Sequence, residues 1–390
     1  MNENIAPGTI STVPPTVPVS DEPPAGDSRI LAATPRQLMW WRFRKHKVAI
    51  AGSIVVMLFY FVAIFCEFVA PATPDIIDGA HKYVPPQQIS FVDSSGHFTF
   101  RPGVYGLTPH RDPVTLRLSY TSDPTQWYPI YLFSTGPDYK LWGLIPSNIH
   151  LLGLGPNSDQ PFFLLGSDRL GRDMFSRVVY AARISMSIGL VGVTLSLIFG
   201  IILGGISGLY GGIADMIIQR VIEFLRSMPT IPLWLALAAA LPPQWPPLYV
   251  YFGITVILSL LGWTRLAREV RGRFIALREE DFVLAARLSG SSQMRIIWRH
   301  MVPSFLSHII AVITLAIPGM ILSETALSFL GLGLRPPVVS WGVLLQDAQN
   351  IQTVAIYPWL LYPGIAVVLV ILAFNFMGDG LRDAADPYGR

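Results

Sequence analysis

Long apolar runs separated by short polar segments dominate this 390-residue chain. A membrane-spanning helix needs roughly 20 mostly apolar residues. Six runs have this character, and they cover residues 48–70, 184–210, 217–241, 249–266, 305–330 and 357–377. The third run is the most interrupted, because it contains Glu223, Arg226, Pro229 and Pro232. The pattern therefore predicts an all-α polytopic membrane protein with six transmembrane helices.

Basic residues lie in the short segments that six spans place on one side of the membrane. Arg42, Arg44, Lys45 and Lys47 precede the first run, and eight arginines fall between positions 265 and 299. Short cytoplasmic loops carry an excess of Lys and Arg. We therefore expect both termini to be cytoplasmic.

The composition agrees with a membrane protein and argues against other classes. The chain is 52% hydrophobic and 14% charged, and its mean hydropathy is +0.48, which is too apolar for an ordinary soluble enzyme. The net charge of +3 is small and lies beside apolar runs, so nucleic acid is not an expected partner. The one cysteine, Cys66, excludes a disulfide within the chain, and the histidines of the outer segment are too scattered to indicate a metal site.

The chain divides into four parts by composition. Residues 1–35 are polar and rich in Pro, Ser and Thr, which predicts a disordered cytoplasmic tail. Residues 36–70 hold the basic segment and the first span, and residues 71–165 form an extracytoplasmic insert. Residues 166–390 form a five-helix core with a cytoplasmic loop at 267–303.

The insert is aromatic and broken by prolines. Alternating side chains at 115–120 and 130–133 predict short strands, so the insert is a small β-rich or mixed unit. Its aromatic residues have two interpretations. They bind a ligand or a docking protein, or they form the core of the insert, which is the commoner role for this composition.

Two features within the spans suggest packing or function. Gly200, Gly204, Gly208 and Gly212 recur every fourth residue, which favours close helix pairing, although glycine is frequent in membrane helices generally. Glu324 falls within the fifth span, where an ionisable group is costly and is a candidate functional site. It lines a pathway, relays protons or forms a structural contact.

The cytoplasmic loop at 267–303 predicts two short helices joined at Gly290, a residue that permits a sharp turn. The small pair Ala285 and Ala286 allows close approach of a partner. Apolar side chains recur at helical spacing in both helices, namely Phe274, Leu277, Leu284 and Leu288, then Met294, Ile297, Trp298 and Met301. Such a surface is typical of docking into a groove of another protein, and equally of lying on an anionic membrane leaflet.

Residues 281–290, with Pro303 at the right distance, resemble the EAA loop found in permease subunits of bacterial ABC importers. More specifically, the chain resembles the C-type permease of the dipeptide and oligopeptide importers. Three further stretches agree with that family, at residues 165–177, 324–342 and 374–387. The resemblance covers residues 36–70 and about 163 to the end.

The resemblance implies a type I ABC importer permease in the bacterial inner membrane. Its expected partners are a second permease chain, two ABC ATPase subunits, an extracytoplasmic solute-binding protein, membrane lipid and a peptide substrate. The residues expected to couple the chain to an ATPase are Asp281, Ala285, Ala286, Arg287, Gly290 and Pro303.

No lysine of the chain sits in a phosphate-binding Gly-x-x-x-x-Gly-Lys-Ser/Thr loop, so we expect a transport subunit without its own ATPase site or cofactor. The resemblance places ATP and Mg in the partner ATPases. It also favours a structural role for Glu324, near the outer mouth.

Leu284 and His300 stand where the general EAA pattern has Glu and Ile, and the insert is longer than the usual outer loop of the family. No conclusion that depends on the Leu284 or His300 side chain is carried over from the family, and the long insert puts the substrate class in doubt. Two other functions stay open: a self-sufficient secondary transporter or channel that uses Glu324, and a membrane-anchored binding or sensor module that uses the insert.

Overall fold

The computed structural model describes residues 35–111, 113–114, 118–155, 158, 160–242 and 244–385. The predicted disordered tail lies outside the described residues up to position 34, and so do the last five residues of the chain. The first helices are α2 (Pro35–Phe43), α3 (Lys47–Ile64) and α4 (Cys66–Val69). The long core helices are α5 (Met174–Tyr210), α6 (Gly212–Ser227), α7 (Thr230–Ala239), α8 (Pro247–Leu277), α12 (Leu306–Phe329) and α15 (Tyr362–Ala385).

Short helices connect the long ones at both ends of the bundle. At one end lie α9 (Asp281–Leu288), α10 (Gln293–Arg295), the π-helical turn η1 (Ile296–Met301) and α11 (Val302–Ser304). At the other end lie α13 (Trp341–Gln346), η2 (Asp347–Gln349), α14 (Ile351–Ile356) and η3 (Pro358–Leu361).

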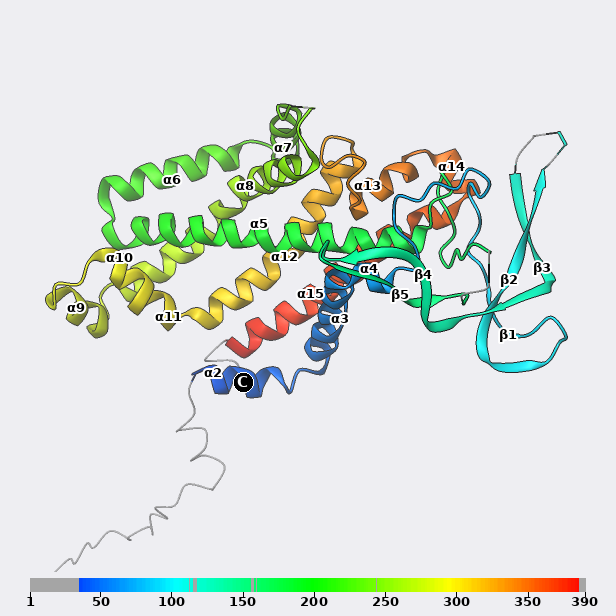
Figure 1. The fold of residues 1–390 in the computed structure, drawn as a ribbon. Coiled ribbons are helices and arrows are strands. Elements are labelled where there is room, and N and C mark those ends of the chain that lie inside the picture. Colours follow the sequence, from blue (N-terminus) through cyan, green and yellow to red (C-terminus); the bar gives the residue numbers. More distant parts are fainter. Residues whose placement is uncertain are drawn as a thin grey trace, which may run out of the picture.

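The helices form an elongated bundle along which α5 runs (Figure 1). The strands lie beyond one end of this bundle, and α9 and α10 lie at the opposite end (Figure 1). Phe43 of α2 and Ala49 of α3 are buried together with Ala384 in the last turns of α15. Both ends of the described chain therefore lie away from the strands.

In the part of the chain that the structure describes, five helices are long and apolar enough to cross a membrane, and the pair α6 and α7 makes a sixth span if it is counted as one. The sequence predicted a third span at about 217–241 that is interrupted by charged residues and prolines, and the structure divides this span into two helices. The two helices meet at 90°. Pro229 explains the break, because a proline disfavours the helical conformation of the preceding residue, and Met228 is extended with φ −85° and ψ 141°.

Helix α5 begins ten residues before the predicted span. Asp173 caps its N-terminus by accepting hydrogen bonds from the backbone N–H groups of Phe175 and Ser176. The added turns contain Arg177 and Arg183, whose charges excluded them from an apolar count, but whose side chains are held in ion pairs. At 37 residues, α5 is longer than a bilayer requires.

The glycines of α5 explain how closely it packs on α8. A Cβ at Gly200 would lie 2.7 Å from the Leu266 Cβ, and one at Gly204 would lie 2.4 Å from the Ala267 carbonyl oxygen. Gly208 lies equally close to Arg271. The fourth glycine of the predicted series does not share this face. Gly212 follows the end of α5, has a φ of +55° and would meet nothing within 4 Å, so its role is in the turn to α6.

The insert contains two separate antiparallel sheets. One has the order β1 (Ile89–Val92), β2 (Phe98–Arg111) and β3 (Leu118–Pro129), and the other pairs β4 (Tyr131–Leu141) with β5 (Ile145–Gly153). Its small core contains Val84, Tyr120 and Phe163.

Several aromatic residues of the insert lie outside its core. Phe98, Phe100 and Phe133 are 66%, 95% and 65% exposed. The interpretation that the aromatic residues mainly fill the core of the insert is therefore wrong for these three residues.

Candidate functional site

The cytoplasmic-loop residues fold into two helical segments on either side of Gly290. Helix α9 begins after Glu280 and ends at Leu288. Gly290 has a φ of +74°, a conformation that residues with a Cβ rarely adopt, and its surroundings are open. The Ser292 hydroxyl then caps α10, which continues through η1 towards Pro303.

Helix α9 has one inward and one outward face. Val283 and Ala286 are buried against Ile296, Ile297 and Met301 of η1. The outward face consists of residues one helical turn apart, all exposed, namely Asp281, Leu284, Ala285 and Leu288. We call these four residues the α9 outer face.

The predicted apolar stripes are thus divided between the two faces. Leu284 is 42% and Leu288 is 90% exposed, whereas Phe274 is fully buried below the loop. Of the two small residues, Ala285 is outward and Ala286 is part of the loop's own core. Arg287 is partly buried, Gly290 and Pro303 are exposed, and Phe282, Met294 and Trp298 extend the exposed apolar surface.

A charged contact that the sequence did not single out fixes the base of this loop. The Arg271 guanidinium of α8 donates two hydrogen bonds of 2.6 Å to the Asp215 carboxylate of α6. The Ser207 hydroxyl of α5 donates to the same carboxylate. Three helices therefore meet at the inner end, just below α9.

Glu324 is fully buried and lies among hydroxyl groups. Among the described residues, its hydrogen-bond donors are Ser185 at 3.2 Å, Ser328 at 2.8 Å and Ser340 at 2.7 Å. Ser185 belongs to α5, and Ser340 also caps α13. Glu324 thus joins α5, α12 and α13, and its side chain reaches no cavity surface in this conformation.

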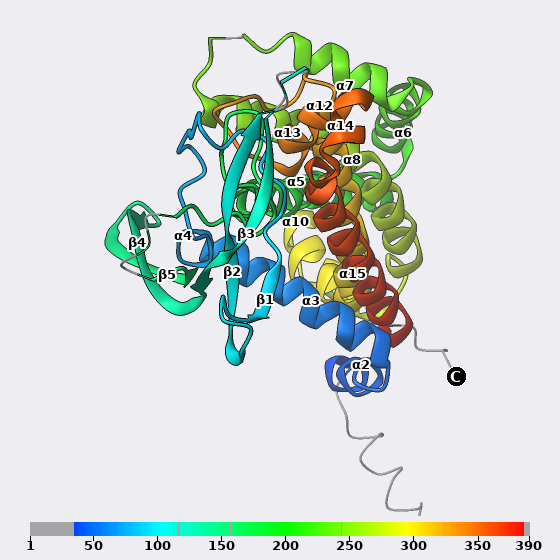
Figure 2. The same ribbon diagram turned by 90° about the vertical axis from the view of Figure 1, so that its right-hand side faces the viewer.

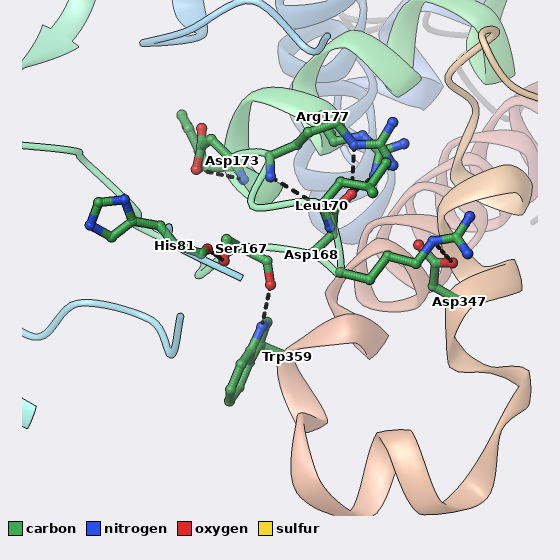
Figure 3. A network of polar contacts seen from close by, with 11 residues as sticks. His81, Ser167, Asp168, Leu170, Asp173, Arg177, Asp347 and Trp359 are labelled. Carbon is green, nitrogen blue, oxygen red and sulfur yellow. Dashed lines mark hydrogen bonds and ion pairs between the residues drawn. The ribbon is translucent and has the colours of Figure 1, made fainter. Parts of the chain in front are cut away.

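A polar network at the outer end was part of a quoted motif but was given no role from the sequence. The Asp168 carboxylate is fully buried and accepts from the backbone N–H groups of Leu170 and Arg172 at 2.8 and 3.0 Å (Figure 3). It forms ion pairs with the side chains of Arg172 and Arg177. Four donors and two cations compensate the burial of this carboxylate.

The same network connects distant parts of the chain. The Trp359 indole N–H donates to the Ser167 carbonyl at 2.9 Å, and the Ser167 hydroxyl donates to the His81 carbonyl at 2.6 Å (Figure 3). Arg169 pairs with Asp347 at 3.3 Å. The insert, the start of α5 and the segment before α15 are therefore held together. Charged residues before a span were the available signal, but Trp359 and Asp347, which join this segment to the rest of the chain, lie far away in sequence.

Burial alters the protonation of Asp173 beside this network. Removal from water raises the pKa of its carboxyl to about 6, although donors from Ser176 and Phe175 favour the charged form. The Asp173 carboxyl therefore changes its charge near pH 6.

Two cavities of similar size have different linings. One, of 460 Å³, lies between α3, α5 and α15 and is lined by apolar side chains and Tyr362. The other, of 420 Å³, lies at the bend between α6 and α7 and also contacts α5, α8 and α12. Its lining includes polar and charged side chains, namely Ser196, Arg226, Thr230, Thr264, Arg265 and Ser323. We call the second one the bend cavity.

The fold and these sites define a multi-pass inner-membrane transport component, and sequence comparison agrees. Residues 197–388 match the family described as the binding-protein-dependent transport system inner membrane component. Residues 34–86 match the N-terminal transmembrane domain of oligopeptide transport permease C.

Curated relatives match more than half of the chain. The dipeptide transport system permease protein DppC of Alkalihalophilus pseudofirmus is 42% identical over 234 residues, which are 60% of this chain and 73% of that protein. The oligopeptide transport system permease protein OppC of Bacillus subtilis is 37% identical over 233 residues, again 60% of this chain and 73% of that protein. The chain belongs to the family of C-type permease subunits of ABC importers, as its motifs predicted.

A solved structure described as inward facing conformations of the MetNI methionine ABC transporter has a TM-score of 0.44 at 16% identity. It covers 55% of this chain and 98% of that chain. This likeness is too low to add to the family assignment, which rests on the sequence matches.

Proposed function

We propose that this chain forms half of the pathway of an ATP-driven importer of dipeptides, oligopeptides or related solutes. A second permease chain supplies the other half, two ABC ATPases bind ATP and Mg, and an extracytoplasmic binding protein delivers the solute. Peptide is the solute class because the names of the relatives specify dipeptide and oligopeptide transport. Both termini lie in the cytoplasm in this proposal, on the side of α9.

The observation that carries the coupling role is the α9 outer face. It presents Leu284 and Leu288 to the surroundings at the end of the bundle opposite the insert (Figure 1). An exposed apolar helix face with a small residue at its centre fits a groove on another protein. Beneath it, α9 is packed on η1, so a force applied to α9 reaches α12 through a buried contact.

The bend cavity supports a translocation role. Polar and ionisable residues in a membrane bundle are costly unless they pair or face water. Arg226 lies next to the break between α6 and α7, and irregular backbone at membrane depth is tolerated where it lines a cavity. The apolar cavity between α3 and α15 has the lining expected against lipid chains, so of these two cavities the bend cavity suits a polar solute better.

The environment of the Glu324 side chain is evidence against the alternative that this chain is a self-sufficient secondary transporter. A coupling carboxylate must exchange ions with a water-filled space, but Glu324 is enclosed and accepts hydrogen bonds from three serines. Its contacts fit a structural role that holds α5, α12 and α13 together.

The test of the coupling role compares two exposed sites. We expect Ala285→Glu to abolish solute uptake and to release the ATPases during purification, because a charge is placed in the docking surface. Ala286→Glu would not serve, since it buries a charge within the loop. The control is Ile351→Glu, an 84% exposed site at the outer end, which should leave the ATPases bound. Normal uptake with Ala285→Glu would contradict the proposal.

The test of the pathway uses adjacent residues of α12. Ser323 lines the bend cavity, whereas Leu322 is 53% exposed and is not part of its lining. The native Cys66 is buried. In the assembled importer, Ser323→Cys should react with a water-soluble thiol reagent and Leu322→Cys should not. Equal reactivity at both sites would contradict a water-filled bend cavity.

A further inference from the structure

The β4–β5 hairpin is the part of the insert that packs on the membrane-spanning helices. His150 of β5 contacts the Ala70 carbonyl after α4, and Phe133 lies 6.0 Å from Phe68 between ring centroids. Leu151 packs against the buried cluster around Val179 of α5. Figure 2 shows β4 and β5 beside α4, to one side of the bundle. Residues 87–196, which include this hairpin, lie outside both family matches.

The tip of the hairpin reaches the end of the first span. The Trp142 indole N–H donates a 2.8 Å hydrogen bond to the Ile64 carbonyl. Its ring lies 5.7 Å from that of Phe65, which in turn lies 5.0 Å from that of Phe61. Ile64 is the last residue of α3. The tip is therefore fixed to a known depth along this helix.

That depth is the outer boundary of the hydrocarbon layer. Helix α3 has 18 residues, and at 1.5 Å per residue it spans about 27 Å, close to the thickness of the hydrocarbon core. At its end, the Arg183 guanidinium donates to the Ala63 and Ile64 carbonyls and pairs with Glu67. The Arg183 side chain is 33% exposed, so a charged group reaches the surface at this position, as expected where headgroups or water are in contact.

The backbone of the tip orients Trp142 at this boundary. Trp142 has a φ of +53°, a left-handed conformation that is rare for a bulky residue. Gly143, beside it, has a φ of +74° and accepts this conformation without strain. An unfavourable conformation at a tryptophan points to a role for its side chain.

The remaining side chains of the tip are apolar and exposed. Trp142 is 49%, Leu144 79% and Ile145 53% exposed. No charged residue lies between Lys140 and His150 in the sequence. This surface is continuous, through the Trp142 contacts, with Phe61 and Ile64 on the exposed side of α3, which are 48% and 47% exposed.

We propose that the tip of the β4–β5 hairpin, residues 141–145, is seated in the outer leaflet of the membrane. Leu144 and Ile145 enter the boundary between headgroups and acyl chains, and Trp142 lies at headgroup level, where tryptophan is enriched. The Lys140 ammonium extends towards lipid phosphates. The proposal depends on α3 and α5 crossing the membrane and not on the nature of the solute.

The test measures the depth of a spin label in the full importer, reconstituted in phospholipid nanodiscs. Leu144→Cys carries the label, and Phe100→Cys, a 95% exposed site on β2, is the matched control. Unmodified chain shows whether Cys66 takes up label. We expect the ratio of collisions with oxygen to collisions with a water-soluble nickel chelate to be about fivefold higher at 144 than at 100, as for a site several ångströms below the headgroups.

Two other results would overturn the proposal. Equal ratios at the two sites would place the tip in water. A label at 144 that is inaccessible to both oxygen and the nickel chelate would show that a protein, such as the second permease chain or the binding protein, covers the tip. Uptake measured on the same variants tests the importer function separately, because a tip that lies in water does not prevent transport.

Discussion

In the orientation proposed above, the insert marks the outer end of the bundle and α9 the cytoplasmic end, and the two ends differ in how they hold charged and apolar residues. At the outer end, the Asp168 carboxylate is fully buried between Arg172 and Arg177, and the network joins the insert to α5 and α15. At the cytoplasmic end, α9 exposes Asp281 with Leu284 and Leu288. The buried charges of the outer network form ion pairs within this chain, whereas the α9 outer face is exposed and, in the function proposed above, docks on another molecule. Changes at the outer end should therefore alter stability, and changes on α9 should alter coupling.

The largest loss of stability is expected from Asp168→Ala. It leaves the Arg177 guanidinium, whose side chain is 3% exposed, without a buried counter-charge, at a cost of about 3–5 kcal/mol. Thermal denaturation of the purified complex measures this loss. Arg169→Gln is the control, because the Arg169 side chain is 58% exposed and its pair is worth about 1 kcal/mol or less. Equal losses of stability for both variants would show that the buried ion pairs of Asp168 stabilise the protein no more than the exposed pair of Arg169.

A pH-dependent effect of up to about 3 kcal/mol is expected at Asp173. Burial raises the pKa of the Asp173 carboxyl from 3.8 to about 6. The contribution of the protonated carboxyl to the stability of the fold is therefore fully present below about pH 4 and is lost as the pH rises through 6. Asp173→Asn keeps a capping side chain without the charge. The variant should gain stability relative to the unmodified chain between pH 4 and 7, as measured by paired melting curves. A difference in stability between the variant and the unmodified chain that does not change with pH would contradict the raised pKa of Asp173.

A smaller loss, about 1–2 kcal/mol, is expected from Asp215→Asn at the inner end. Its ion pair with Arg271 has side chains that are 21% and 32% exposed, so water compensates part of the lost interaction. The same melting assay compares it with Asp168→Ala. A larger loss of stability for Asp215→Asn than for Asp168→Ala would contradict the expectation that changes at the outer end affect stability more.

The smallest change in stability is expected from Leu288→Ser, within about 0.5 kcal/mol, because the side chain is 90% exposed. Uptake and solute-stimulated ATP hydrolysis should nevertheless fall severalfold. Val283→Ser is the contrasting variant, since Val283 is fully buried and its loss should destabilise the loop. Unchanged coupling with Leu288→Ser would remove Leu288 from the docking surface.

The spans and the family could be predicted because each depends on local sequence. Apolar runs located all six hydrophobic segments, and the EAA-like residues identified the family. The bend at Pro229 was not predicted, because prolines also occur within continuous membrane helices. The sequence placed Ala285 and Ala286 together in the docking surface, but only Ala285 is exposed, because Ala286 packs against η1.

The outer network was also missed, for a different reason. Its contacts join Ser167 to Trp359 and Arg169 to Asp347, which are about half the chain apart. A single sequence contains no signal for such pairs. Glu324 shows the converse case, in which the position was singled out from the sequence but its three serine partners required the fold.

The most direct test of the proposed coupling is a photo-crosslinking residue in place of Leu288, irradiated in native membranes. If the α9 outer face docks on an ABC ATPase, the crosslinked product contains this chain and that ATPase, and Ile351 replaced in the same way gives no such product. If the Leu288 site crosslinks to phospholipid and to no ATPase, α9 lies on the inner leaflet, and the account of coupling given for this chain is wrong.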